Sequence, residues 1–456
     1  MVMMKTEVKK HMNVIYMHTH DSGRYWSPYG YNVPTPSILA FAKEATVFRQ
    51  CYCAGPTCSP SRAGLLTGYS PHENGMLGLA SRGWRLNDYE HHLACYLGRH
   101  GYETVLCGIQ HEAPDYSMIG YKRIIGSQEF SMDRTEQSME EWDYANTDEA
   151  CRYLEEKGQK GGEPFFLSMG WFNTHREFPK VEKDINPDYL TVPLPLYDCD
   201  VNRRDMADYH ESVRVVDRCF GRIMNVIERA GLRENTVIIL TTDHGIAFPQ
   251  MKCTLYDTGI GVAFIMDYPG NPRKGKAVDA LMSQLDVFPT VCELTGIEIP
   301  GWAEGNSILP YMKGKTGKIR DEIFSEVTYH AAYEPKRCIR TERYKLIRFF
   351  DYHNGVVPAN IDEALSKQFL AENGFLDTKR CREYLFDLWL DPMERENLSA
   401  SEKYADVYND LSERLEKWMK QTNDPLLKYG SRVPRPEGAR VNKLTCLNPR
   451  IEDFEE

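Results

Sequence analysis

The segment Thr57–Gly68, which reads TCSPSRAGLLTG, is the stretch around which the rest of the chain is organised. It predicts a loop that enters a short helix at Cys58, with Arg62 one helical turn further on. A cysteine in such a place is by default a small buried side chain. Whether Cys58 has a chemical role therefore depends on the side chains that other segments bring to it.

Candidate metal ligands follow two predicted strands. The apolar run Asn13–Met17 predicts a buried strand that opens into His20–Asp21, and Val237–Leu240 runs in the same way into Asp243–His244. The carboxyl ends of parallel strands meet at one edge of a sheet, where α/β proteins bind their ligands. The carboxylates and imidazoles of these two pairs therefore predict a site for one divalent metal ion beside the cysteine.

Two further histidines and a lysine are predicted on the same edge of the sheet. His111 follows the predicted strand Thr104–Cys107, His175 follows the predicted strand Phe165–Met169, and Lys252 comes shortly after the second ligand pair. A single histidine in a loop is more often structural than catalytic. Two histidines on the rim that carries the candidate metal ligands indicate an active site.

The alternation of buried strands and helices predicts an α/β fold over residues 1–320, with a large, mostly parallel central sheet flanked by helices. Asp205–Ala230 is the clearest helix, and its apolar stripe is core packing. Asp279–Leu294 is predicted as a later helix. Over residues 321–456 polar strands and a late helix predict a smaller α+β domain with an antiparallel sheet. The tail Arg432–Glu456 is expected to wrap the surface or to contact another subunit of a homo-oligomer.

The composition limits the classes of partner. A net charge of -11 argues against nucleic acid. The N-terminus, Met1–His11, has no apolar core of a signal peptide, and no later run is apolar enough to span a membrane. We therefore expect a cytoplasmic protein without membrane association. The thirteen cysteines lie mostly in apolar or helical runs, which fits reduced thiols better than disulfides.

The pattern Cys-x-Pro-Ser-Arg followed by Leu-Thr-Gly, between Cys58 and Gly68, resembles the signature of the type I sulfatases of the alkaline-phosphatase-like superfamily. In that family a maturation enzyme oxidises the cysteine to formylglycine, and the hydrate of this aldehyde is the nucleophile. The resemblance implies an alkaline-phosphatase-like fold, a formylglycine at position 58, and hydrolysis of a sulfate ester or sulfamate.

The same resemblance implies roles for the rim residues. One hydroxyl of the hydrate attacks sulfur, and a base then deprotonates the second hydroxyl so that sulfate is expelled; the family histidine with this role falls on His111. His175 and Lys252 fall on the positions that clamp the sulfate and donate a proton to the leaving group. Arg62 falls on the arginine that holds the hydrate and offsets its charge.

The metal site departs from the family pattern. Sulfatases usually have Asp-Asp after the first strand and Asp-Asn or Asp-His after the second, whereas this chain has His20 and Asp21, then Asp243 and His244. Two carboxylates suit calcium, which is the expected ion. Two imidazoles favour manganese or zinc, which stay open as alternatives. His20 is either a ligand or a hydrogen-bond donor to one.

A second departure is Ile109, which stands where the family motif Gly-Lys-x-His has its lysine. The change leaves the sulfate one cation short unless His18, His20 or Arg24 compensates. Two alternatives therefore stay open. One is a phosphonate or phosphate diester hydrolase of the same superfamily, where the Asp-His form of the second metal pair also occurs. The other is a catalytically silent homologue that only binds its ligand.

The most specific resemblance is to the heparan N-sulfatases and extends along most of the chain. It implies a sulfated sugar of the N-sulfoglucosamine type, with a small aryl or sugar sulfate as the alternative. The histidine-rich loop that recognises the sugar in that group corresponds to Glu326–Glu334 and matches poorly, so the exact sugar stays open. The resemblance rests on Cys58–Gly68, Pro71–Leu79, Asp243–Pro249, Leu255–Tyr256, Trp418 and Asn423–Pro425.

Overall fold

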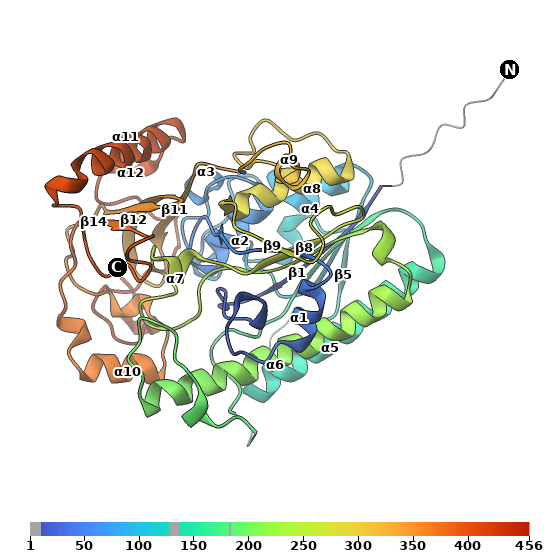
Figure 1. Ribbon diagram of the computed structural model, residues 1–456, viewed down its shortest axis with the longest axis horizontal. Coiled ribbons are helices and arrows are strands. Elements are labelled where there is room, and N and C mark those ends of the chain that lie inside the picture. Colours follow the sequence, from blue (N-terminus) through green and yellow to red (C-terminus); the bar gives the residue numbers. More distant parts are fainter. Residues whose placement is uncertain (1–10, 128–135, 182–183, 456) are drawn as a thin grey trace.

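The computed structural model describes residues 11–127, 136–181 and 184–455 (Figure 1). Residues 1–10, most of the segment in which the sequence predicts no signal peptide, lie outside the described residues. Among the helices that are described, none has the length and apolar character that crossing a membrane requires.

Eight strands form the larger sheet, in the spatial order β5-β4-β6-β1-β7-β8-β2-β9. Within the described residues β8 is antiparallel to both of its neighbours, and every other neighbouring pair is parallel. The predicted large, mostly parallel sheet is therefore confirmed. The strands are β1 (Asn13–Thr19), β2 (Thr46–Phe48), β4 (Glu103–Gly108), β5 (Arg123–Ile125), β6 (Phe165–Gly170), β7 (Thr236–Thr242), β8 (Phe264–Asp267) and β9 (Lys276–Val278).

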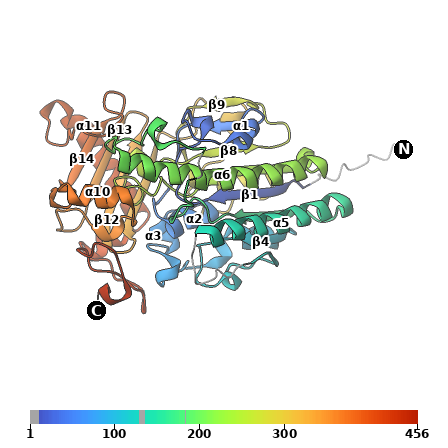
Figure 2. The ribbon, with the colours of Figure 1, turned by 90° about the horizontal axis from the view of Figure 1, so that it is seen from below.

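Helices cover both faces of this sheet, because successive side chains of a strand point to opposite faces. On β1, Val14 and Tyr16 join one apolar cluster, and Ile15 and Met17 join another. The first cluster includes side chains of α2 (Cys58–Thr67), α4 (Leu93–Arg99) and α8 (Val287–Thr295); the second includes those of α1 (Pro36–Ala42), α5 (Glu136–Lys160) and α6 (Asp200–Arg229). Figure 1 shows the two layers of helices, and Figure 2 shows α5 and α6 side by side.

Two predicted helices have different bounds in the structure. The helix expected over Asp205–Ala230 is α6 and already begins at Asp200. The helix expected over Asp279–Leu294 begins only at Val287, because β10 (Met282–Ser283) pairs with β3 (Cys51–Tyr52). A capping box between Ser283 and Asp286 then starts a short 3-10 turn that leads into α8.

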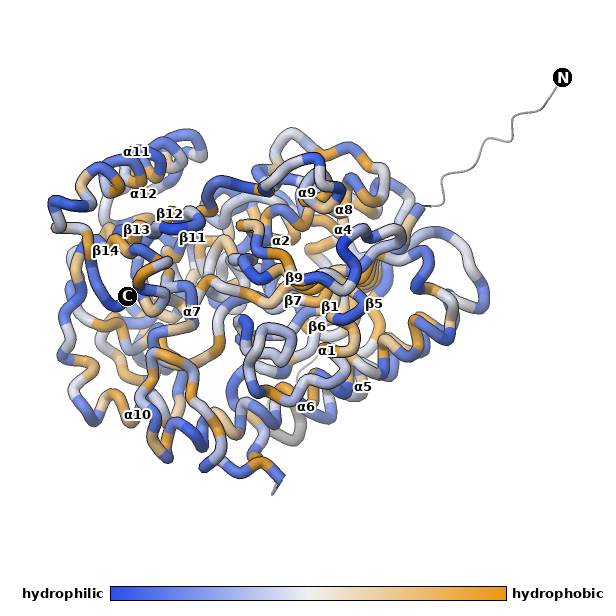
Figure 3. Tube along the Cα trace, in the orientation of Figure 1, coloured by the Kyte–Doolittle hydropathy of each residue, from blue (hydrophilic) through white to orange (hydrophobic). Residues whose placement is uncertain are grey.

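The C-terminal part forms a smaller antiparallel sheet, as predicted. Its strands β11 (Glu322–Tyr329), β12 (Tyr333–Thr341), β13 (Tyr344–Phe349) and β14 (Glu383–Asp387) pair in this order. One face of this sheet packs against α11 (Ala405–Gln421). In Figure 3 much of α11 is hydrophilic, while hydrophobic segments gather among the central strands of the larger sheet. The division into two domains at residue 320 remains a prediction. The short helices are α3 (Pro71–Asn74), α7 (Asp257–Ile260), α9 (Leu309–Met312), α10 (Leu365–Glu372) and α12 (Pro425–Tyr429).

A buried ionic network connects α3 to the smaller sheet. His72 Nδ1 lies 2.8 Å from Glu326 Oε1, and Arg337 lies 3.0 Å from the other oxygen of Glu326. The same guanidinium bonds to Asp424, with its Nε 2.6 Å from Oδ2. Burial alone would lower the pKa of His72, but the charge of Glu326 and its hydrogen bond outweigh this effect and raise the pKa. Protonated His72 therefore stabilises the contact between α3 and β11.

This network predicts a pH-dependent contribution to stability. A histidine whose pKa is raised by folding stabilises the protein below its unfolded pKa, and the contribution is lost as the pH rises through the folded value. The free-energy difference between the wild type and His72→Gln, measured by urea unfolding, should therefore be roughly 1 kcal/mol larger at about pH 5.5 than at about pH 8.5. The same change at the exposed His100 is the control. A difference that is equal at both pH values would contradict the prediction.

Candidate active site

The ends of β1 and β7 bring the two predicted ligand pairs together. The strands are parallel neighbours and Thr19 pairs with Thr242, so the next residues of each strand lie side by side. The backbone N–H of Asp21 donates to Asp243 Oδ1 at 2.9 Å. Asp21 has a φ of 40°, which turns the chain sharply where the strand ends. The short strand-to-loop turn thus points both carboxylates toward one place.

The ligand atoms of this cluster fit a divalent cation. His20 Nδ1 lies 3.3 Å from Asp243 Oδ2, and His244 Nε2 lies 3.2 Å from Asp21 Oδ1. Among the described residues, Asp21 Oδ1 and both ring nitrogens of His20 are buried without a hydrogen-bond partner. Buried polar atoms normally have partners. One atom each from His20, Asp21, Cys58 and Asp243 lies within 4.8 Å of the others, so one ion would satisfy them all.

The two imidazoles are prepared for this role in different ways. Burial, reinforced by the charge of Arg62, lowers the pKa of His20 well below its ordinary value, so its ring is neutral. Its contact with Asp243 is therefore not an ion pair. His244 Nδ1 lies 3.0 Å from the carbonyl oxygen of Gly245. This hydrogen bond favours a proton on Nδ1 and leaves Nε2 as the atom that faces the carboxylates.

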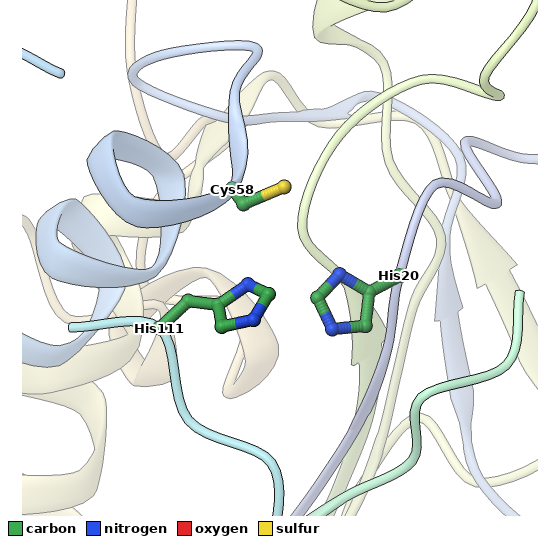
Figure 4. A group of neighbouring side chains, drawn as sticks. All are labelled: His20, Cys58 and His111. Carbon is green, nitrogen blue, oxygen red and sulfur yellow. The ribbon is translucent and has the colours of Figure 1, made fainter. Parts of the chain in front are cut away.

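Cys58 begins α2 and points into the same space. Its Sγ lies 3.6 Å from His244 Nε2, and the residue is 4% exposed. Figure 4 shows the sulfur and the imidazoles of His20 and His111 directed toward one another. Burial raises the pKa of the Cys58 thiol above its ordinary value. The thiol is therefore protonated, and a protonated thiol is a poor nucleophile.

Arg62 lies one turn along α2, buried beside the candidate ligands. Its Nη2 donates to Asp243 Oδ2 at 3.0 Å and to the carbonyl of Thr19 at 2.9 Å, and its Nη1 contacts His18 Nδ1. Its Nε is buried and has no hydrogen-bond partner among the described residues. Arg62 thus binds the ligand cluster through Nη2, contacts His18 through Nη1, and keeps Nε free.

His111 and His175 form the half-buried side of the site. The centres of their rings lie 4.7 Å and 5.3 Å from that of His20. Burial lowers the pKa of both histidines, so both rings are neutral near physiological pH. A neutral imidazole near Cys58 can accept a proton and then donate it.

Lys252 closes the site from the other side, together with a residue that the sequence did not predict. Its Nζ lies 2.9 Å from Asp21 Oδ2 and 2.8 Å from Asp362 Oδ2. Burial alone would lower the pKa of Lys252, but Asp21 and Asp362 outweigh it and raise the pKa, so the ammonium stays charged. Asp362 lies in a segment without hydrophobic periodicity. Its acidic side chain is the one signal that the sequence offered, and it does not distinguish Asp362 from other acidic residues.

None of the three residues that could compensate for the missing lysine at position 109 is placed as a free cation beside the candidate ligands. His18 contacts Arg62, and burial lowers the pKa of both His18 and His20. Arg24 lies over the ring of Tyr52, 4.6 Å from its centre, and lines a cavity of about 770 Å³ that none of the nine predicted site residues lines. Lys252 and Arg62 are therefore the cations that the described residues bring to the site.

Comparison with known proteins relates this arrangement to a family. The profile of the family described as Sulfatase matches residues 12–297, and that described as N-sulphoglucosamine sulphohydrolase, C-terminal, matches residues 247–357. An ulvan-active sulfatase from Formosa agariphila is 27% identical over 96% of this chain and 86% of its own. Human N-sulphoglucosamine sulphohydrolase is 24% identical over 91% of this chain and 89% of its own.

A solved structure supports the same relationship at the level of the fold. It is a protein in complex with its substrate D-glucosamine-2-N,6-O-disulfate; it is 20% identical and covers 91% of this chain and 99% of its own, with a TM-score of 0.68. The Sulfatase profile spans more than half of the 456 residues and includes both strand ends and Cys58. The chain therefore belongs to the sulfatase family of sulfuric ester hydrolases.

Proposed function

We propose that this protein hydrolyses a sulfate ester or sulfamate on a sulfated sugar of the N-sulfoglucosamine type. The observation that carries the proposal is the cluster of Cys58 with His20, Asp21 and Asp243, whose ligand atoms lie within 4.8 Å of one another. The sugar class is supported by the similarity to the human N-sulphoglucosamine sulphohydrolase and to the neighbour bound to a sulfated glucosamine.

The proposed nucleophile is the hydrate of a formylglycine made from Cys58 by a maturation enzyme. As a protonated, buried thiol, Cys58 attacks poorly, and a thiol also lacks the second hydroxyl through which the hydrate releases sulfate. Arg62 Nε, which has no partner among the described residues, is the donor proposed to hold this group. His111 is the proposed base, because its neutral ring faces the same space as the side chain of Cys58.

The proposed metal ligands are His20, Asp21, Asp243 and His244. A divalent ion held by them would neutralise the charge of the sulfate oxygens. We expect calcium, which the two carboxylates favour, and keep manganese and zinc as alternatives because of the two imidazoles. His175 and Lys252, which flank this cluster, are proposed to bind the sulfate and to donate a proton to the leaving group.

Hydrolysis of matched esters tests this function. The protein is produced together with a formylglycine-generating enzyme and assayed with calcium on 4-nitrophenyl sulfate, 4-nitrophenyl phenylphosphonate and N-sulfoglucosamine. We expect release of sulfate, with kcat/KM at least about tenfold higher for the sulfate ester than for the phosphonate.

The second candidate function is that of a phosphonate or phosphate diester hydrolase, which Asp243–His244 and Ile109 favour.

Each outcome selects one candidate. A clear preference for the phosphonate would reject the sulfatase proposal in favour of the diester hydrolase. Conversion of Cys58, seen in the intact mass, without turnover of any of the three substrates would favour the silent binding protein. Turnover of N-sulfoglucosamine would support the sugar class, and turnover of the aryl sulfate alone would restrict the proposal to small sulfate esters.

A further inference from the structure

The ammonium of Lys252 lies between two carboxylates from distant parts of the chain. Asp21, at 2.9 Å, follows β1, and Asp362, at 2.8 Å, lies between β13 and β14. The side chain of Lys252 is only 4% exposed. A buried charge needs nearby opposite charges, because water cannot solvate it. The two carboxylates therefore hold the ammonium in place.

Asp21 has two roles that compete. Its Oδ2 accepts from Lys252, whereas its Oδ1 faces His244 Nε2 among the proposed metal ligands. A divalent cation and an ammonium that share one carboxylate repel each other. A second carboxylate beside the lysine offsets that repulsion. Asp362 contacts the lysine and lies outside the cluster of His20, Asp21, Cys58 and Asp243.

The backbone around Asp362 is firmly anchored. The carbonyl of Ile361, the preceding residue, accepts a hydrogen bond from Lys367 Nζ at 2.7 Å. Asn360 Oδ1 accepts from the backbone N–H of Ala332, in the turn between β11 and β12, at 2.8 Å. The turn between β11 and β12, together with α10, thus anchors the two residues that precede Asp362.

We propose that Asp362 is a positioning residue that holds Lys252 at the site and thereby leaves Asp21 available to the metal ion. This inference rests on the proposed function of the metal site and of Lys252. It assigns to the C-terminal part of the chain a contribution to metal affinity, although the proposed ligands all come from the N-terminal part.

The test measures calcium binding by isothermal titration calorimetry, apart from any turnover. Asp362→Asn should lower the calcium affinity about tenfold, because Lys252 then depends on Asp21 alone. In a Lys252→Met background the same substitution should lower the affinity less than about threefold, since the competing ammonium is gone. Glu363→Gln, the same change of charge at the exposed neighbouring residue, is the matched control and should leave the affinity unchanged.

Turnover of 4-nitrophenyl sulfate gives a second readout. Asp362→Asn should lower kcat about tenfold or more at saturating calcium. Asp362→Glu should recover part of the loss, because it restores a carboxylate to the same segment. Circular dichroism checks that each variant is folded.

The outcomes separate this inference from the proposed function. An equal loss of calcium affinity in both backgrounds, or no loss in either, would overturn the positioning role while leaving the sulfatase proposal intact. A wild-type protein that binds none of calcium, manganese and zinc would overturn the metal site itself, and the positioning role with it.

Discussion

Replacing Cys58 by alanine is expected to abolish sulfate ester hydrolysis, with a loss on the order of 10⁴-fold or more in kcat. The side chain at position 58 is proposed to form and break the bond to the sulfur of the substrate. In the described part of the structure, no other cysteine belongs to the cluster with His20, Asp21 and Asp243. Release of 4-nitrophenol from the sulfate ester measures the effect. The intact mass of the wild type shows the loss of one sulfur and two hydrogens and the gain of one oxygen that conversion produces.

The matched control is Cys53→Ala. Cys53 is fully buried at the start of the loop that leads to Cys58, and it packs in the apolar core. Its replacement should cost about 1 kcal/mol of stability and leave kcat unchanged. Residual turnover in Cys58→Ala above a few per cent of the wild-type rate would show that position 58 is not the nucleophile.

Replacing Asp243 by asparagine is expected to have the second largest effect. Asparagine keeps the shape, but it removes the negative charge that faces Arg62, at 3.0 Å, and His20, at 3.3 Å. We expect kcat/KM to fall about 10³-fold, because both the proposed metal ion and the guanidinium lose their partner. The free energy of unfolding should fall by about 3 kcal/mol, since a buried arginine is left with an uncompensated charge.

Asp286→Asn separates the two effects of Asp243→Asn. Asp286 is also a buried carboxylate paired with an arginine, Arg320, but it lies away from the candidate ligands. Urea unfolding should show a loss of similar size in both variants, whereas only Asp243→Asn should change calcium binding and turnover. If Asp286→Asn reduced turnover as strongly, the loss in Asp243→Asn would reflect stability alone.

The sequence predicts the centre of the fold well, because strands buried on both faces leave an unmistakable pattern. Val14–Met17 and Val237–Leu240 are continuous apolar runs, as expected of strands with helices on both sides. The long helix α5 was not predicted, because charged residues dominate its sequence. Its burial against α6 is a property of the tertiary structure that no local pattern reveals.

The residues of the candidate site also divide into those that a local sequence pattern reveals and those that only the tertiary structure brings together. Residues that directly follow buried strands, such as Asp21 and Asp243, were found from local pattern, because parallel strands meet at one edge. Asp362 was missed, since its contact with Lys252 joins parts of the chain that no motif relates. Arg24, one of the three residues that could compensate for the missing lysine, could not be placed from the sequence for a similar reason. Its distance from Asp21 in the sequence is short, yet its side chain turns away to Tyr52.

The burial of Cys58 also has a consequence for the order of events during synthesis. At 4% exposure, its sulfur is closed to any second protein once His244 lies against it. Cys58 leaves the ribosome 186 residues ahead of His244, which at cellular translation speeds is a lead of roughly 10 to 40 s. The proposed oxidation of Cys58 would therefore have at least this interval before His244 can cover the sulfur, and slow elongation between the two residues would lengthen it.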